Sequence, residues 1–355
     1  MKRALSALSL LLVLAVVPVL SQSAPSMTAH FIDVGQGHAT LLEFSCGAVL
    51  LDAGAQDVAS RTRLISYLQR FFRRRTDLHN TINAVLITHN HIDHDFALRA
   101  VVETFDVEHY VDQGILIGPG APNPAWLRSE VASGHRQTSI REVTEPEIEA
   151  LPEKVGLTDA AIDPVACADT DPEIRVLQGH FTTNPGWSAD AYDNLNNHSL
   201  VTRVDFNDAS LLFMGDLEMD GIASLLGYYT GAARQLLDAD VLQVGHHGSN
   251  NATTQDLLDA TTPAVAVIPV GKWTFGAHGG AFTTFAYGHP RELAVALLQQ
   301  NMSRRRRPAK SVMVAEGAKR FHEARISKAV YATGWDGTVR VVVKTKNDIT
   351  VYRER

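Results

Sequence analysis

Three imidazoles and a carboxylate lie within six residues of one another, directly after a short apolar run. The run is Ala84-Val85-Leu86-Ile87, which has the length and composition of a buried strand, and His89, His91, Asp93 and His94 follow it. Imidazole is a common zinc ligand, and carboxylate extends the choice towards manganese. A loop at a strand end can offer His89 and His91 to one ion and Asp93 and His94 to another. Since only 15 of 355 residues are His, a chance grouping is improbable, and the segment predicts a metal site.

Further candidate ligands stand beside later strand-like runs. His198 precedes one such run, Asp216 follows the apolar residues 211–214, and His246 follows the apolar residues 241–244. Each of them alone is more often a turn or capping residue. Together they supply a third His for one ion, another His for the second, and a carboxylate to bridge the two. Metal ions about 3.5–4 Å apart need such a bridge, because neighbouring dications repel each other.

The combined pattern resembles a known family. Residues 89–94 match the HxHxDH motif of the metallo-β-lactamase superfamily, and the chain more narrowly resembles the C-terminal hydrolase domain of the ComEC competence proteins. This resemblance extends over residues 29–343, and the stretches that carry it are residues 31–40, 51–54, 196–200, 214–218, 241–249 and 287–290. One departure is Asp95-Phe96-Ala97, where many ComEC-type domains have a Gly-rich helix start.

The resemblance implies an αββα sandwich with the site where strand-end loops converge. It implies two divalent ions, zinc or alternatively manganese. His89, His91 and His198 would hold one ion, Asp93, His94 and His246 the other, and Asp216 would bridge them. His246 is preferred to His247 as a ligand because it directly follows Gly245.

Three side chains have further expected roles around these ions. Asp93 would orient the attacking hydroxide, besides binding metal. His247 would donate to a substrate oxygen or support a ligand, with a purely structural role as the alternative. His289 is a candidate to contact the substrate or to support a ligand near the site, and the alternative is that it only starts a helix.

The expected chemistry is hydrolysis, in which a metal-bridging hydroxide attacks the substrate. A phosphodiester or nucleic-acid substrate is the first expectation, although a small molecule also fits. One alternative is hydrolysis of an amide or ester, such as a β-lactam or lactone, and another is a non-catalytic binding protein that kept the fold. Di-iron redox members of the superfamily typically carry Glu where this chain has His91.

The rest of the chain reads as one α/β domain over residues 29–345. Strand patterns are expected at 30–34, 40–44, 48–51, 84–87, 108–111, 199–206, 210–214, 240–244, 264–270, 311–315 and 338–344, and helices at 58–72, 96–105, 220–227, 253–260 and 291–300. Apolar periodicity fades over residues 113–190, which we interpret as a loop-rich insertion with a helix around 140–151. This stretch and the aromatic segment 273–286 are expected to border the cleft.

The N-terminal residues have the order of a secretory signal. Lys2 and Arg3 precede an apolar run to Leu20, and small residues follow it, so residues 1–23 predict a cleaved signal peptide and an exported protein, periplasmic or extracellular. An uncleaved anchor is the alternative. No later run is long enough for a membrane span. Cys46 and Cys167 would meet an oxidising compartment, and the sequence leaves open whether they pair. It also leaves the oligomeric state open.

The overall composition limits the possible functions. A hydrophobic content of 45% is enough to fill a large core. A net charge of −7 argues against a protein that binds nucleic acid through its overall charge. Two basic runs, residues 73–75 and 304–307, each follow a helical pattern. Solvated helix caps are the simpler interpretation, because positive charge is favourable at helix C-termini. If the second run lines the cleft, it would guide a polyanion.

Overall fold

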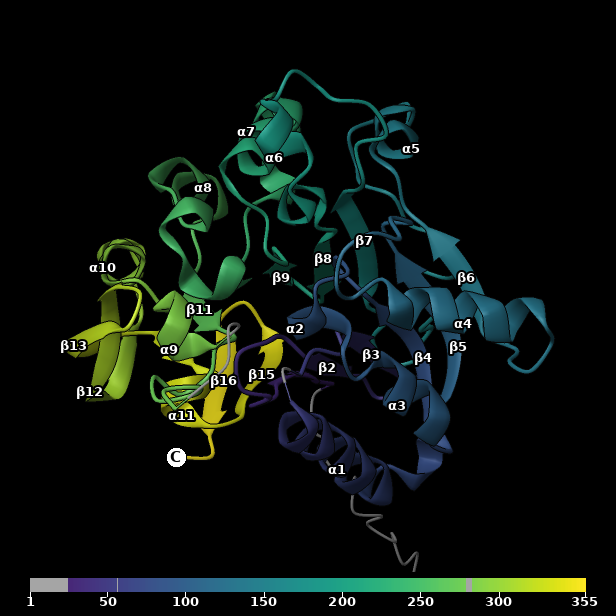
Figure 1. The fold of residues 1–355 in the computed structure, drawn as a ribbon, viewed down its shortest axis with the longest axis horizontal. Helices are drawn as coiled ribbons and strands as arrows, with labels where there is room; N and C mark the ends of the chain where they lie inside the picture. The colour runs from purple at the N-terminus through teal and green to yellow at the C-terminus, as the bar shows by residue number, and fades with distance from the viewer. Residues whose placement is uncertain (1–24, 56, 279–282) are drawn as a thin grey trace, which may run out of the picture.

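Two facing sheets form the body of the protein in the computed structural model, which describes residues 25–55, 57–278 and 283–355 (Figure 1). The first sheet has eight strands, in the order β16 (Asp348–Arg353), β15 (Val339–Thr345), β1 (Met27–Phe31), β2 (Thr40–Glu43), β3 (Ala48–Leu51), β4 (Thr81–Leu86), β5 (Asp106–Asp112) and β6 (Ser139–Glu142). The second has six, in the order β14 (Val330–Ala332), β11 (Val265–Ile268), β10 (Val241–Gln243), β9 (Ala209–Phe213), β8 (Val201–Phe206) and β7 (Glu173–Gln178).

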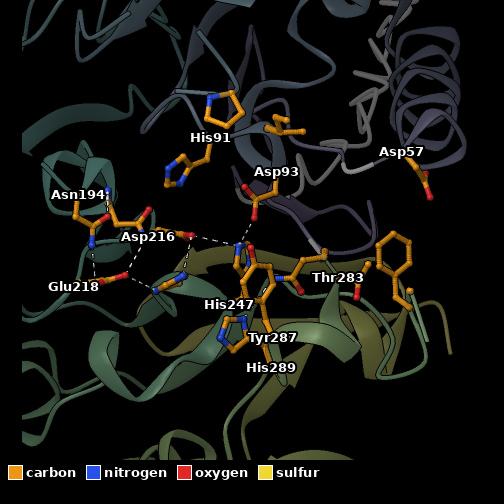
Figure 2. A pocket seen from close by; sticks show the side chains of 17 residues that line it. Asp57, His91, Asp93, Asn194, Asp216, Glu218, His247, Thr283, Tyr287 and His289 are labelled. Carbon is orange, nitrogen blue, oxygen red and sulfur yellow. Dashed lines mark hydrogen bonds and ion pairs between the residues drawn. The ribbon is translucent and has the colours of Figure 1, made fainter. Parts of the chain in front are cut away.

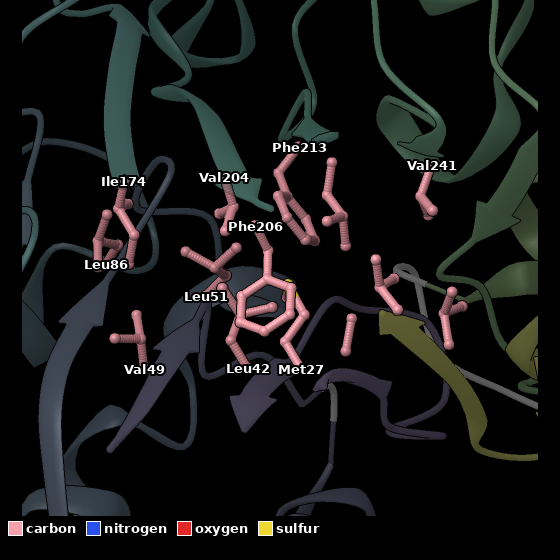
Figure 3. Close-up of a cluster of buried hydrophobic side chains, with 14 of the residues drawn as sticks. Met27, Leu42, Val49, Leu51, Leu86, Ile174, Val204, Phe206, Phe213 and Val241 are labelled. Carbon is pink, nitrogen blue, oxygen red and sulfur yellow. The ribbon is translucent and has the colours of Figure 1, made fainter. Parts of the chain in front are cut away.

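The core between the sheets is filled by apolar side chains from both inner faces (Figure 3). Phe31 of the first sheet stacks on Phe213 of the second, with ring centroids 6.0 Å apart. Residues of β3 are buried on both faces, because Val49 and Leu51 point between the sheets and Leu50 points towards the helices outside. This two-sided burial explains why the strand is a continuous apolar run rather than an alternating one.

Helices cover the outer face of each sheet, which confirms the predicted αββα sandwich. The first sheet is covered by α1 (Val58–Arg74), α3 (Leu98–Thr104) and α4 (Pro122–Ala132), and the second by α7 (Met219–Tyr228), α8 (Gln255–Thr261) and α10 (Glu292–Asn301). Asp57 caps α1 by accepting a hydrogen bond from the backbone N–H of Ser60 at 2.6 Å. Leu64, Leu68 and Phe71 then recur on the buried face of that helix.

The stretch expected to be a loop-rich insertion contains more structure than the sequence indicated. Besides α4, β6 and β7, it includes α5 (Glu145–Glu149) and α6 (Ala189–Tyr192). The expected helix at 140–151 is therefore a strand followed by a short helix. The sequence of β6, Ser-Ile-Arg-Glu, has too little apolar alternation to signal a strand, and its pairing with β5 determines its conformation.

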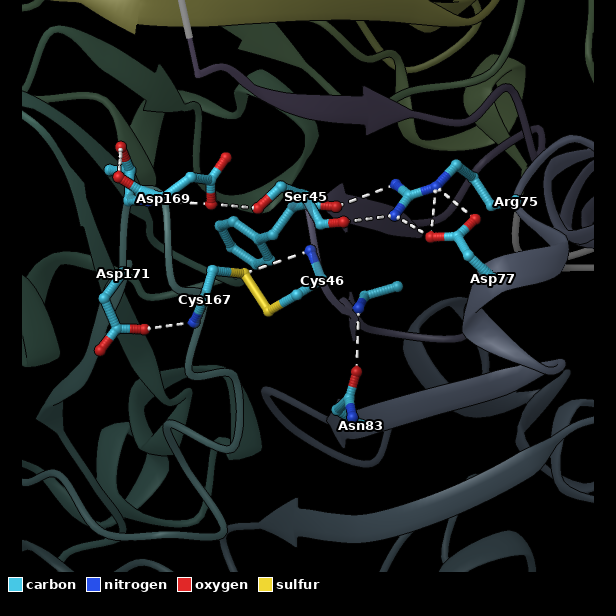
Figure 4. Close-up of a disulfide and its surroundings, with 11 residues drawn as sticks. Ser45, Cys46, Arg75, Asp77, Asn83, Cys167, Asp169 and Asp171 are labelled. Atoms are coloured by element: carbon cyan, nitrogen blue, oxygen red, sulfur yellow. Dashed lines mark hydrogen bonds and ion pairs between the residues drawn. A yellow bond between two sulfur atoms is a disulfide. The ribbon is translucent and has the colours of Figure 1, made fainter.

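A disulfide between Cys46 and Cys167 joins this region to the turn between β2 and β3 (Figure 4). The sequence left this pairing open. The bridge closes a loop with a sequence separation of 121 residues. A cross-link over so long a loop removes many conformations from the unfolded chain.

Removing this disulfide is expected to lower the stability of the protein substantially. The variant Cys46→Ala/Cys167→Ala should lose about 2–4 kcal/mol in free energy of unfolding, chiefly because the unfolded state gains conformational freedom. Denaturant unfolding followed by circular dichroism measures the change. Wild-type protein unfolded with a reducing agent should match the variant, and equal stability of oxidised wild type and variant would contradict the expectation.

The C-terminal part adds a separate two-stranded hairpin, β12 (Arg305–Gly317) and β13 (Arg320–Lys328). Within the basic run 304–307, residues 305–307 therefore begin a strand, and the run is not simply a solvated helix cap. Arg306 is buried and pairs with Asp336 of α11 (Thr333–Asp336). Its Nη1 donates to Asp336 Oδ2 at 2.9 Å.

Two remaining expectations concern membranes and the N-terminus. The signal peptide predicted at residues 1–23 lies outside the described residues. Within the described part of the chain, every helix is too short or too polar to cross a bilayer.

Candidate metal centre

The loops that follow β4, β9 and β10 converge around one cavity of about 720 Å³. The first loop continues into a short helix, α2 (Ile92–Asp95), and the cavity is lined on that side by His91 and Asp93. Asp216 and His247 line it from the second sheet. Figure 2 shows these side chains directed towards one another across the cavity.

Four side chains place ligand atoms within 4.8 Å of one another: Asp93, His94, Asp216 and His247. His247 Nε2 lies 3.2 Å from Asp93 Oδ2 and 3.3 Å from Asp216 Oδ2. His94 Nε2 lies 3.2 Å from Asp216 Oδ1. We refer to these four residues as the Asp93 cluster. Two carboxylates and two imidazoles of this kind are a suitable donor set for a divalent metal ion.

The hydrogen bonds of the Asp93 cluster fit a metal ion. His94 Nε2 and Asp216 Oδ1 are buried and make no hydrogen bond among the described residues, although they lie 3.2 Å from each other. The other nitrogen of each imidazole is held: His94 Nδ1 donates to Asp52 Oδ2 at 2.7 Å, and His247 Nδ1 donates to the carbonyl of Pro269 at 2.7 Å. Both Nε2 atoms are thereby directed at the carboxylates of Asp93 and Asp216, where a metal ion would bind. Since an unpartnered buried polar atom is costly, a cation at this position would complete the cluster.

The charges of the Asp93 cluster are strongly coupled. Burial disfavours the charged form of His247, but Asp216 and Asp93 outweigh that effect and raise its pKa to about 10. Burial alone would raise the pKa of Asp216, but the neighbouring His247 and His94 outweigh burial and hold that pKa well below the usual range. In the absence of a cation, protonated imidazoles therefore balance the charge of the ionised carboxylates. Metal binding would have to displace those protons.

His89 and His91 form a second pair of candidate ligands. His89 Nε2 lies 3.0 Å from His91 Nδ1, and the His89 ring centroid lies 4.2 Å from that of His94. Burial and the neighbouring His94 lower the pKa of His89 well below the ordinary value. A neutral imidazole is the form that binds metal. The structure thus places all four candidate ligands of the 88–95 loop together.

His198, expected as the third ligand beside this pair, has its ring nitrogens engaged elsewhere. Its Nδ1 accepts from the backbone N–H of Phe181 at 3.3 Å, and its Nε2 donates to the carbonyl of Tyr192 at 2.7 Å. The ring lies among the aromatic side chains of Tyr192 and Trp187. Residues 195–198 form a 3₁₀ turn, which directs this ring towards the insertion. The structure therefore does not bring His198 into the Asp93 cluster or to His89.

His246 and His247 have exchanged the positions expected for them. The expectation rested on the position of His246 directly after Gly245, but both histidines have positive φ, 44° and 52°. The second of the two therefore enters the Asp93 cluster. His246 turns its Nδ1 to Glu218 Oε1 at 2.9 Å, and its Nε2 lies 3.9 Å from Asp216 Oδ2.

His289 lies against the centre, as expected. Its ring stacks on His247 at 6.1 Å and on Tyr287 at 5.9 Å between centroids. Burial and the neighbouring His246 lower its pKa well below the ordinary value. A role for His289 in supporting the site stays a prediction.

Asp52 holds the centre together and was not assigned a role from the sequence. Its Oδ2 accepts from His94 Nδ1 and, at 2.8 Å, from His38 Nδ1, and its Oδ1 accepts from the backbone N–H of Thr88 at 2.7 Å. Burial alone would raise its pKa, but His94 and His38 outweigh burial and lower it. Its position directly after a strand, in Leu51-Asp52-Ala53, was the available signal.

The facing sheets and the His/Asp cluster at their strand ends define an α/β sandwich with a candidate metal centre. The chain belongs to the metallo-β-lactamase superfamily, whose family model matches residues 32–272. Members of this superfamily are typically metal-dependent hydrolases, and the candidate metal ligands of such an enzyme are present here.

Individual relatives agree with the ComEC-like resemblance. The chain is 30% identical to ComE operon protein 3 of Bacillus subtilis over 164 residues, which are 46% of this chain and 18% of that protein. It is 42% identical to Recombination protein 2 of Haemophilus influenzae over 78 residues, 22% of this chain and 9% of that protein. The chain thus spans less than a fifth of the length of either relative. Among solved structures, the metallo-beta-lactamase fold protein YhfI from Bacillus subtilis matches with a TM-score of 0.32 and 11% identity, over 61% of this chain and 70% of that one.

Proposed function

We propose that the protein is an exported, metal-dependent hydrolase of phosphodiester bonds in nucleic-acid-type substrates. The observation that carries this proposal is the Asp93 cluster: His94 Nε2 and Asp216 Oδ1 are buried without a hydrogen bond among the described residues, and Asp93, Asp216 and His247 line a cavity of about 720 Å³. Two divalent ions, zinc or manganese, would provide Lewis acidity and a nucleophilic water near neutral pH when bound.

Each group of the centre has a distinct part in this proposal. The Asp93 cluster would hold one ion, and His89 with His91 would contribute to holding the second. Asp216 lies beside His94 and His247 and is placed to bridge. Asp93 also orients the attacking water, since its Oδ2 lies at the cavity.

His246 is placed to contact the substrate rather than a metal ion. Its Nδ1 forms an ion pair with Glu218 Oε1 at 2.9 Å, and Glu218 in turn accepts from Asn194 and Asn196 at 3.0 and 2.8 Å. All four residues line the cavity. The Nε2 atom of His246 is therefore oriented to donate a hydrogen bond to a substrate oxygen.

The names of the relatives and the disulfide support the substrate class and the compartment. Recombination protein 2 and a competence protein of Neisseria gonorrhoeae are named for processes that involve nucleic acid. The disulfide is typical of proteins that fold in an oxidising compartment, which agrees with export.

A metal-reconstitution experiment tests the proposal. Protein stripped with a chelator and reloaded with zinc or manganese is expected to hydrolyse bis(p-nitrophenyl) phosphate and single-stranded DNA, whereas Asp216→Asn is expected to be inactive on both. The same preparations are assayed on a lactone and a β-lactam. Hydrolysis of only the lactone or β-lactam would identify an amide or ester hydrolase instead, and full activity without metal would overturn the proposal.

A further inference from the structure

Positive charge is concentrated in the C-terminal part of the chain. Residues 291–355 contain 15 Lys and Arg against six Asp and Glu, although the whole chain contains 32 against 39. This part forms α10, the β12–β13 hairpin and the strands β14 to β16. Figure 1 shows the hairpin at the left edge of the molecule, with α9 (Thr284–Tyr287) between it and the centre.

One group of cations gathers where the hairpin begins and ends. Arg305, the first residue of β12, pairs in register with Lys328, the last residue of β13. The neighbouring strand β16 contributes another cation. We call this group the basic cluster, and its members are Arg304, Arg305, Arg307, Lys328 and Arg353.

Hydrogen bonds to backbone carbonyls hold the segments of the basic cluster together. Arg304 Nη2 donates to the carbonyl of Ile349 at 2.8 Å, and Arg353 Nη2 donates to the carbonyl of Arg307 at 3.3 Å. These contacts join the start of the hairpin to the edge strand of the first sheet. The cations are thereby held near one another even though like charges repel.

The basic cluster has no carboxylate partner among the described residues. Among the described residues of this part of the protein, the ion pairs that Lys and Arg make belong to Arg306, Lys310, Lys344 and Arg355, none of which is in the basic cluster. Arg305 and Arg307 are exposed, so their charge faces solvent. Uncompensated positive charge of this kind attracts a polyanion.

A second group of cations lies at the other end of the hairpin, beside the cavity. A Cβ added to Gly317 would lie 3.0 Å from Arg320 Nη2 and 3.4 Å from Arg291 Nη1, so both guanidinium groups flank the same glycine. Arg291 Nη2 donates to the carbonyl of Tyr287 at 2.9 Å, and Tyr287 lines the cavity. Arg291 and Arg320 thus lie next to the rim of the candidate metal centre.

The hairpin therefore links positive charge at the cavity rim to the basic cluster. A strand of nine residues such as β13 spans about 30 Å, which is enough for several phosphates of an extended strand. The cavity itself is lined by no Lys or Arg among the described residues. Cationic side chains that bind a long polyanion must therefore lie outside the cavity.

We propose that the β12–β13 hairpin, with the basic cluster, binds the phosphate backbone of single-stranded nucleic acid and leads it to the cavity. A single strand fits better than a duplex, because a cavity of this size admits one nucleotide rather than a base-paired helix. This proposal rests on the proposed phosphodiesterase function for its substrate class. It adds a binding surface outside the metal centre.

A matched pair of variants tests the role of the hairpin. Arg305→Gln/Arg307→Gln removes two exposed charges of the basic cluster, and Arg70→Gln/Arg73→Gln removes two exposed charges of α1. The dissociation constant of a fluorescent single-stranded DNA of about 20 nucleotides is measured by anisotropy over a range of salt concentrations, with chelator present. The hairpin variant is expected to bind about 5–10-fold more weakly, with a salt slope lower by about 1.4 for two lost phosphate contacts. The α1 variant is expected to match wild type.

The outcomes separate this proposal from the proposed function. Hydrolysis of bis(p-nitrophenyl) phosphate by the metal-loaded hairpin variant should equal that of wild type, because this small substrate does not reach the hairpin. Equal DNA affinity of the two variants, or no DNA binding by wild type, would overturn the role of the hairpin whether or not the enzyme is active. Loss of binding to phosphatidylglycerol vesicles without loss of DNA binding would reveal a membrane surface and also overturn it. Unchanged melting temperatures verify that both variants fold.

Discussion

Replacing His247 with alanine is expected to lower kcat/KM for a phosphodiester by more than about 100-fold and to reduce the metal content of the purified protein. Loss of a residue that merely supports a ligand typically costs 10–100-fold in affinity or activity, and His247 presents Nε2 directly to Asp93 and Asp216 at 3.2 and 3.3 Å. Metal analysis after dialysis, together with steady-state kinetics, measures both effects.

His246→Ala is the matched control for this prediction, since the two histidines are adjacent in the chain. It is expected to retain the wild-type metal content, because His246 bonds to Glu218 through Nδ1 and its Nε2 lies 3.9 Å from Asp216 Oδ2. Its kinetic effect should come from weaker contact with substrate. If His246→Ala lost the metal while His247→Ala kept it, the assignment of the two residues would be reversed.

Breaking the buried ion pair between Arg306 and Asp336 is expected to destabilise the protein by about 3–5 kcal/mol. Both side chains are completely buried, and Asp336 also accepts from Lys310 Nζ at 3.2 Å. Asp336→Ala would leave the Arg306 guanidinium buried without a counterion. Thermal and denaturant unfolding measure the loss.

Two further variants identify the cause of that loss. Arg306→Met/Asp336→Ala should recover part of the stability, because it removes the uncompensated charge, whereas Arg305→Ala, which truncates an exposed neighbour, should change stability by less than about 0.5 kcal/mol. If Asp336→Ala melted like wild type, the pair would contribute little to the fold. Destabilisation by Asp336→Ala that the double change failed to reduce would instead indicate lost backbone contacts.

The sequence was most informative where candidate ligands lie close together in the chain. One buried strand is followed directly by His89, His91, Asp93 and His94. Their proximity in space could therefore be predicted once that strand was placed correctly in the sequence. Asp216 follows β9, whose apolar run is equally clear. The superfamily and the sandwich fold were predicted on this basis, and both predictions are confirmed.

The sequence was less informative where the direction of a side chain depends on local backbone conformation. Two consecutive residues with positive φ decide that His247 rather than His246 enters the Asp93 cluster. His adopts positive φ more often than most residues, but such a conformation is still too uncommon to be predicted from the residue type alone. His198 is turned away by a short 3₁₀ segment. Pattern analysis places a residue at the end of a strand but does not orient its side chain.

Charge runs were misleading for a related reason. The four consecutive arginines at 304–307 suggested a solvated cap, but the last three of them enter a strand and alternate in burial, and Arg306 faces the interior. A period of two places neighbouring side chains on opposite faces. The buried member stabilises the hairpin, while the exposed members remain available for a ligand.

The first strand of the described residues, β1, lies in the middle of a sheet, and this has a consequence for biogenesis. Met27–Phe31 pairs on one side with β2 and on the other with Val339–Val343, near the opposite end of the chain. During synthesis, one edge of β1 stays unpaired until more than 300 further residues have been made, because its partner strand β15 lies that far along the chain. Exposed edges of this kind invite pairing with other chains. Newly made protein is therefore expected to depend on chaperones until its last strands have emerged.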